Sequence, residues 1–232
     1  MFNRLDEQLL DRISLWLLIA VIVLVPSIYI PQFNNGGGGI YKIGEYEQIV
    51  PLYDDYTTKP KFYTMLVVVC LLLITQYLKI KQNKKEINWR KEYLPLVLFL
   101  GLVFLSALFS PYKKVVIYGK TYRHEGLLAF VSYAILFFAA IGVVDTKEKL
   151  QKFLKYLFIS GTVISVIGLI QYFGYDLIKL QAKRMRAEST LGNPDFAGSY
   201  VSLLFPLSFV LFFYAKSKVK LSIARILKDE GY

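Results

Sequence analysis

Two short polar segments, 120–126 and 183–195, place basic side chains directly before long apolar stretches of this chain. Their basic residues are Lys120, Arg123, His124, Lys183, Arg184 and Arg186. Charged groups beside hydrocarbon are costly unless they are paired or open to water, so they are candidates for function. Arginine favours anionic oxygens because its guanidinium donates two parallel hydrogen bonds. The chemistry that these residues predict is the binding of a phosphate or a pyrophosphate.

The second polar segment also contains a turn that predicts the start of a helix. The residues of this turn are Gly192, Asn193, Pro194 and Asp195. A polar residue followed by proline fits a capped helix start, which presents free N–H groups and a partial positive charge. Such an end attracts an anion and would act together with the arginines. The alternative is that the basic side chains only snorkel or form ion pairs, for example Arg123 with Glu125.

The elements that must position these residues are apolar segments. Of the 232 residues, 55% are hydrophobic and only 19% are charged, whereas soluble domains are about 45–50% apolar and about 25% charged. The apolar residues form blocks near the roughly 20 residues that a helix needs to cross a bilayer. Backbone groups in lipid must be satisfied internally, and the alternation of a barrel is absent, so helices are expected. The sequence predicts an all-α, polytopic transmembrane bundle with about six spans, at approximately 13–30, 62–77, 94–110, 127–144, 153–173 and 197–215.

The distribution of basic residues predicts the orientation of these spans. Of the 28 Lys and Arg residues, 17 fall at the two termini and in the loops after the second and fourth segments. The positive-inside rule therefore predicts a cytoplasmic N-terminus, and it puts both polar segments on the outer side. The segment 31–61 is expected to be a solvated outer loop, with a short hairpin or a surface helix as alternatives. The segment 216–232 is expected to be a basic cytoplasmic tail against membrane lipid.

Several classes of function lack a signal in this sequence. The lysines are scattered over loops, so nucleic acid is not an expected partner. One histidine and one cysteine without carboxylates arranged around them do not predict a metal site. A glycine-rich phosphate loop is absent, and we expect no cofactor. No catalytic residue is assigned, because a lone His124 among many serines does not indicate a triad.

The two polar segments resemble two signatures of the O-antigen ligase and O-antigen polymerase family. Residues 122–130 resemble the R-x-E-G-L signature of that family, with Arg123, Glu125 and Gly126 at the matching positions. Residues 186–195 resemble its R-x-x-S-T-x-G-N-P-N signature, except that Asp195 stands where asparagine is common. The order and separation of the two motifs also fit. Together they indicate the front half of such a protein.

The resemblance implies a membrane glycosyltransferase that uses no nucleotide sugar. It would transfer or polymerise a glycan from a polyprenyl-pyrophosphate carrier to an acceptor hydroxyl, on the outer face of a bacterial cytoplasmic membrane. Arg123 and Arg186 would bind the pyrophosphate, with Arg184 and Lys183 as weaker candidates. Residues expected to shape the site are Glu125, Gly126, Gly192, Asn193, Pro194 and Asp195. The sugar and the acceptor stay open.

The resemblance does not extend to the whole family pattern. Members carry a histidine in a large outer loop later in the chain, and His124 does not match that position. We therefore expect the chain to be part of a longer protein and to be inactive alone. Two other functions remain open: a transporter or flippase of a lipid-linked glycan, and a non-enzymatic membrane assembly subunit.

Overall fold

The structure, a computed structural model, describes residues 2–29, 38–43, 46–51, 57–83, 91–120, 123–175 and 186–229. Its α-helices are α1 (Phe2–Ser27), α2 (Thr58–Asn83), α3 (Leu94–Phe109), α4 (Lys113–Tyr118), α5 (Leu127–Val143), α6 (Lys147–Tyr172) and α7 (Pro194–Asp229). Two 3-10 turns, η1 (Lys91–Tyr93) and η2 (Ser189–Leu191), precede α3 and α7. Two strands, β1 (Gly38–Ile43) and β2 (Tyr46–Pro51), form an antiparallel hairpin.

The predicted all-α bundle is confirmed, and each of the six predicted spans lies in a helix apart from a few residues at the ends. Five of these helices are long and apolar enough to cross a membrane by length and composition. The sixth, α5, is apolar but has only 17 residues, or about 26 Å at 1.5 Å per residue against a hydrocarbon core of about 30 Å. The chain therefore has the architecture of a helical membrane protein.

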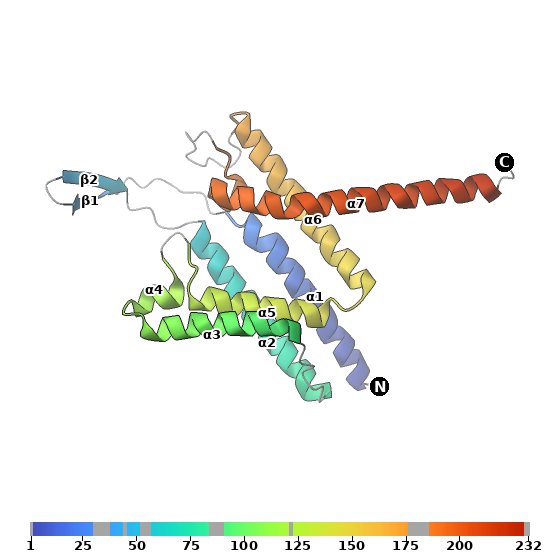
Figure 1. The fold of residues 1–232 in the computed structure, drawn as a ribbon, viewed down its shortest axis with the longest axis horizontal. Helices are drawn as coiled ribbons and strands as arrows, with labels where there is room; N and C mark the ends of the chain where they lie inside the picture. The colour runs from blue at the N-terminus through green and yellow to red at the C-terminus, as the bar shows by residue number, and fades with distance from the viewer. Residues whose placement is uncertain are drawn as a thin grey trace.

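The core of the molecule lies between α1, α2 and α5. One cluster of buried residues joins these three helices and consists of Leu15, Leu18, Ile19, Val68, Leu72, Ala139 and Val143. A second cluster lies nearer the start of α2 and consists of Phe62, Met65, Val69 and Ala129. In Figure 1, α1, α2 and α6 run diagonally, while α3 and α5 lie together across α1 and α2 and α7 crosses above.

Polar contacts add to this packing between helices. The Ser14 hydroxyl of α1 donates to Thr75 Oγ1 of α2 over 3.1 Å, and both residues are buried. The Ser160 hydroxyl of α6 donates to the carbonyl oxygen of Ile22 over 3.3 Å. Inside a bilayer, lipid is as apolar as leucine, so helices associate through close packing and hydrogen bonds of this kind. These contacts therefore help to hold α1, α2 and α6 together.

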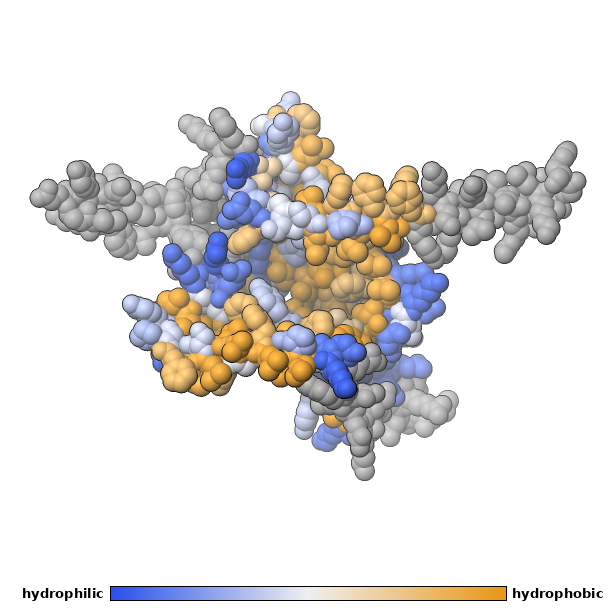
Figure 2. All heavy atoms as spheres, in the orientation of Figure 1, coloured by the Kyte–Doolittle hydropathy of each residue, from blue (hydrophilic) through white to orange (hydrophobic). Residues whose placement is uncertain are grey.

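Large apolar side chains cover the outside of two helices. No residue of α3 is buried, and Leu102, Leu108 and Phe109 are among its exposed side chains. Leu203 and Phe212 are similarly exposed on α7. Figure 2 shows this hydrophobic surface over α3, α5 and the first part of α7, with hydrophilic residues gathered where α2 and α7 begin. An exposed apolar surface of this extent fits contact with lipid.

Two segments differ in detail from the main expectation. The predicted outer loop 31–61 contains the hairpin, which the sequence left as an alternative, and it also contains the first turn of α2. The hairpin pairs Ile40 with Ile49 and stands away from the helices (Figure 1). The predicted tail 216–232 is helical as far as Asp229 and continues α7 without a break.

Candidate functional site

The first turn of α2 is the point at which the two polar segments of the sequence meet. Lys61 and Phe62 are consecutive residues of this turn, and both are buried. The Lys61 ammonium donates to the carbonyl oxygen of Thr190 over 2.6 Å. The Phe62 ring stacks on the His124 ring, with centroids 5.3 Å apart and planes at 17°. Both motifs therefore contact the same turn, at the same end of the bundle.

The second motif is fastened to three helices by hydrogen bonds. The Ser189 amide donates to Gln171 Oε1 over 2.7 Å, and the Ser189 hydroxyl donates to the carbonyl oxygen of Ile164 over 2.6 Å, so both bonds reach α6. The Thr190 hydroxyl donates to the carbonyl oxygen of Pro26 in α1 over 2.8 Å. Ser189 has a φ of 51°, a conformation that is strained for a residue other than glycine. The hydrogen bonds hold this strained turn in place.

Helix α7 begins as the sequence predicts. Pro194 is its first residue, and the Asp195 amide donates to Asn193 Oδ1 over 2.8 Å, which is a side-chain cap. Gly192 precedes the cap with a φ of 74°, in the left-handed region that favours glycine. A Cβ added at Gly192 would lie 2.7 Å from Thr57 Cβ. The glycine thus lets the turn approach the residue before α2.

A groove of about 640 Å³ runs from this helix start along the face of α6. Arg186 and Asp195 form the polar side of the groove. Ser165 and Gly168 of α6 and Gly198 of α7 also line it, and their small side chains leave space between the two helices. Arg186 is 78% exposed and its ion pair with Asp195 spans 3.9 Å, a long and solvated contact. The guanidinium is therefore held only weakly by Asp195. It could turn towards an anion at the start of α7.

The first motif forms a loop closed by two glycines. Gly119 ends α4 with a φ of 84°, and Gly126 directly precedes α5. A Cβ added at Gly126 would lie 2.4 Å from the Gly119 backbone nitrogen, so the two ends of the loop touch. His124 has a φ of 51°. Between these ends the loop presents Arg123 and Glu125, both exposed.

Most of the predicted site residues gather at this end of the molecule. Arg123 and Arg186 lie in two loops that contact one turn of α2. Glu125 and Gly126 belong to the first of these loops, and Gly192, Asn193, Pro194 and Asp195 form the start of α7. Lys183 and Arg184 lie outside the described residues. Within the described part of the chain, no group of three or more His, Cys, Asp or Glu residues could hold a metal ion.

Two residues of this site have no counterpart among the sequence predictions. Lys61 was counted with the basic residues of an outer loop, and Phe62 with an apolar span. A lysine that directly precedes an apolar span is usually interpreted as a snorkelling side chain. The structure instead buries the Lys61 side chain, which is only 9% exposed. No local sequence signal indicates this burial, because the acceptor of the Lys61 ammonium is the Thr190 carbonyl, far away in the chain.

The likeness to the O-antigen ligase and polymerase family is carried by the two short motifs alone. Comparisons of the chain with protein families, with curated proteins and with solved structures found no match.

Proposed function

We propose that this chain forms the diphosphate-binding part of a membrane glycosyltransferase that takes its glycan from a polyprenyl-pyrophosphate carrier. The reaction would occur on the outer face of a bacterial cytoplasmic membrane, with the N-terminus in the cytoplasm. The observation that supports this proposal most strongly is that the two arginine-bearing loops contact one turn of α2. Two arginines from separate loops suit a diphosphate, which offers anionic oxygens on two phosphorus atoms.

The proposed chemistry gives the arginines a defined role. As the glycosidic bond to the carrier breaks, negative charge develops on the departing pyrophosphate. Fixed cations and free N–H groups at that position lower the barrier because they bind the developing charge more strongly than the ground state. Arg186 lies beside the capped start of α7, where the helix also contributes a partial positive charge.

A reconstituted transfer assay tests the proposal. The full-length protein is placed in proteoliposomes with a polyprenyl-pyrophosphate glycan and an acceptor, and the product is measured by mass spectrometry. We expect Arg186→Ala and Arg123→Ala each to lower transfer by about 100-fold or more, and Arg186→Lys to retain part of the rate. Arg12→Ala is the matched control, because Arg12 is an exposed arginine in the first half of α1, away from the end of α1 that contacts Thr190.

The assay also separates this proposal from its competitors. Wild-type transfer rates in Arg186→Ala, at equal protein levels, would remove that arginine from the site. Movement of the carrier between leaflets without a new glycosidic bond would indicate a transporter instead. If the complete protein neither transfers the glycan nor moves the carrier, the result favours an assembly subunit.

A further inference from the structure

Lys61 is buried at the site although nothing in the proposed chemistry uses it. Among the described residues, the buried charged side chains are those of Lys61 and Glu188. Burial of an ammonium group is unfavourable unless hydrogen bonds replace the lost water. Lys61 has such a bond, since its Nζ lies 2.6 Å from the carbonyl oxygen of Thr190. A buried lysine bound to a backbone carbonyl serves to fix that backbone.

The backbone that Lys61 holds is the strained turn of the second motif. Thr190 follows Ser189, which is 3% exposed and has a φ of 51°. Arg186 lies three residues before Ser189, and the cap residue Asn193 lies three residues after Thr190. A shift of this turn would therefore move both the guanidinium and the start of α7. The position of the proposed anion site thus depends on how firmly the turn is held.

The residue after Lys61 holds the other loop. Phe62 is 5% exposed and its ring stacks on His124, the neighbour of Arg123. One rigid helical turn consequently contacts both arginine-bearing loops, one through a hydrogen bond and the other through a ring. Reaction rates are sensitive to separations of this kind, because a misplacement of about 1 Å can lower a rate by about 100-fold.

We propose that Lys61 is a positioning residue that sets the separation between the Arg186 loop and the Arg123 loop. Only one part of this inference rests on the proposed function, namely the expected effect of Lys61 on glycan transfer. Its structural part, the fixed separation of the two loops, can be measured without any substrate. A lysine that merely stabilised the fold would change the amount of folded protein, but not the kinetics of the folded fraction.

The experiment compares Lys61→Met with Lys61→Arg in the full-length protein. Met keeps the length of the side chain and removes the donor, whereas Arg keeps a cation and donors of different geometry. Lys59→Met is the matched control, since Lys59 is an exposed lysine in the same turn of α2. The first readout is transfer of glycan from the polyprenyl-pyrophosphate carrier. We expect Lys61→Met to lower kcat by about 10- to 100-fold with a smaller change in KM, Lys61→Arg to recover part of the loss, and Lys59→Met to match the wild type.

The second readout is the distance between spin labels on cysteines introduced at Lys120 and Ala187, with Cys70 replaced by serine. These positions lie in the two arginine-bearing loops. We expect one narrow distance distribution in the parent protein and in Lys59→Met, and a broader one in Lys61→Met. Should the Met variant fail to fold, Lys61→Gln takes its place, because glutamine keeps a side-chain N–H donor group without the charge.

The two readouts separate the possible failures. An unchanged distance distribution together with wild-type kcat in the folded fraction of Lys61→Met overturns the inference. A broadened distribution in that variant, with no transfer by the wild-type protein, supports the positioning role of Lys61 and rejects the proposed glycosyltransferase. A loss of transfer with an unchanged distribution also overturns the inference, because Lys61 would then act by some other means than the separation of the loops.

Discussion

His124 and Ser189 are the described non-glycine residues with positive φ, and each lies in one of the two arginine-bearing loops. Strained backbone persists only where its surroundings determine it, and it is often found at functional sites. Both strained residues make contacts that hold their backbone in this conformation. His124 stacks on Phe62, and Ser189 makes two hydrogen bonds to α6. Both strained residues therefore lie where contacts with neighbouring helices hold these loops.

Gly126 provides a residue-scale prediction about the first loop. In Gly126→Ala, the new Cβ would lie 2.4 Å from the Gly119 nitrogen and 2.5 Å from the Ile117 carbonyl oxygen, both backbone atoms that cannot turn away. We expect a loss of about 1–3 kcal/mol in the free energy of unfolding, as for other overpacked positions. The measurement is the thermal midpoint of the purified protein in detergent.

Gly142→Ala is the matched control for this change. Gly142 lies in α5, the helix that follows Gly126, and a Cβ there would meet no atom within 4 Å. Replacement of an exposed helical glycine by alanine is expected to be neutral or to stabilise by up to about 1 kcal/mol. Equal midpoints for the two variants would show that the loop ends are not in close contact.

The sequence predicts only those site residues that can be recognised from residue type and from the spacing of nearby residues. Arginines, glycines and an N-cap are recognisable from residue type and spacing, and Arg186, Gly192 and Asn193 were found in this way. Lys61 was not, because its burial depends on the Thr190 carbonyl, 129 positions away in the chain. A hydrogen bond between such distant residues leaves no pattern in a single sequence.

At the scale of elements, hydropathy located the helices but not all of their ends. The start of α6 follows from Thr146, whose hydroxyl accepts from the Lys149 amide over 3.3 Å, and the start of α7 follows from Asn193. The last apolar span was predicted to end near residue 215, where lysines begin, whereas α7 itself runs on to Asp229. The segment 216–229 contains neither glycine nor proline, so the helix continues although the apolar residues thin out. Hydropathy marks the limit of an apolar stretch, which is a different property from the limit of a helix.

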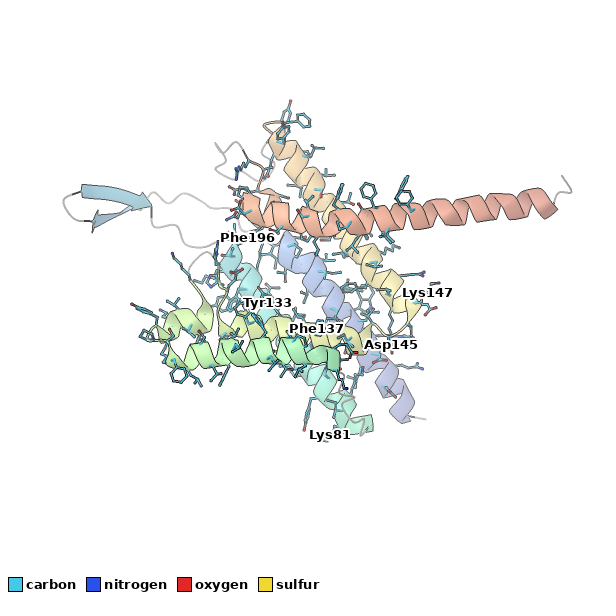
Figure 3. All side chains as sticks on the ribbon, viewed as in Figure 1. Lys81, Tyr133, Phe137, Asp145, Lys147 and Phe196 are labelled. Carbon is cyan, nitrogen blue, oxygen red and sulfur yellow. The ribbon has the colours of Figure 1, made fainter. Side chains whose placement is uncertain are left out.

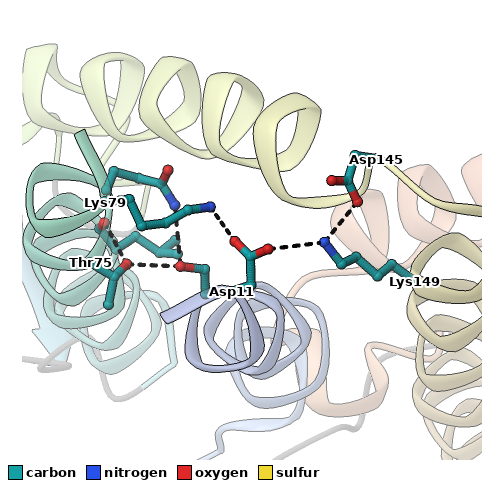
Figure 4. A network of polar contacts seen from close by, with 8 residues as sticks. Asp11, Thr75, Lys79, Asp145 and Lys149 are labelled. Carbon is teal, nitrogen blue, oxygen red and sulfur yellow. Dashed lines mark hydrogen bonds and ion pairs between the residues drawn. The ribbon is translucent and has the colours of Figure 1, made fainter. Parts of the chain in front are cut away.

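A charged cluster at the other end of the bundle gives an element-scale prediction. Asp11 of α1 pairs with Lys79 of α2 and, over 3.5 Å, with Lys149 of α6, which also pairs with Asp145 over 2.7 Å (Figure 4). In Asp11→Ala, two ammonium groups would lose the carboxylate between them and repel each other. Because the groups are partly solvated, we expect a loss of about 1 kcal/mol in the free energy of unfolding. Tryptophan fluorescence during heating in detergent measures the loss.

Two further variants test the cause of that loss. Lys149→Met in the Asp11→Ala background removes one of the two cations and is expected to recover part of the midpoint. Asp145→Ala is the milder control, because the Asp145 side chain is 54% exposed and pairs with Lys149 alone among the contacts described. A double variant less stable than Asp11→Ala would show that repulsion between the lysines is not the cause.

At the scale of the whole molecule, the fold brings distant segments together at two opposite ends of the bundle. Thr190 contacts Pro26 at the end of α1, and Lys61 at the start of α2 contacts Thr190, so these segments share one end. Figure 3 shows Phe196 of α7 near this end, with Lys81, Asp145 and Lys147 on the far side of the bundle. The positive-inside rule predicts that the first end faces outwards and that the second faces the cytoplasm.

Cysteine labelling of intact cells tests this orientation directly. Single cysteines replace Lys120, Ala187, Lys81 and Lys147 in turn, after Cys70 has been changed to serine. A membrane-impermeant maleimide is expected to react with positions 120 and 187 from outside, and with positions 81 and 147 only after the membrane has been opened, because a charged reagent cannot cross the hydrocarbon core. If positions 81 and 147 react from outside, and positions 120 and 187 only after the membrane has been opened, the orientation is the reverse of the predicted one. The two arginine loops would still lie on the same side. Reaction of positions 120 and 187 from opposite sides of the bilayer would separate Arg123 from Arg186, and a shared diphosphate site would then be impossible.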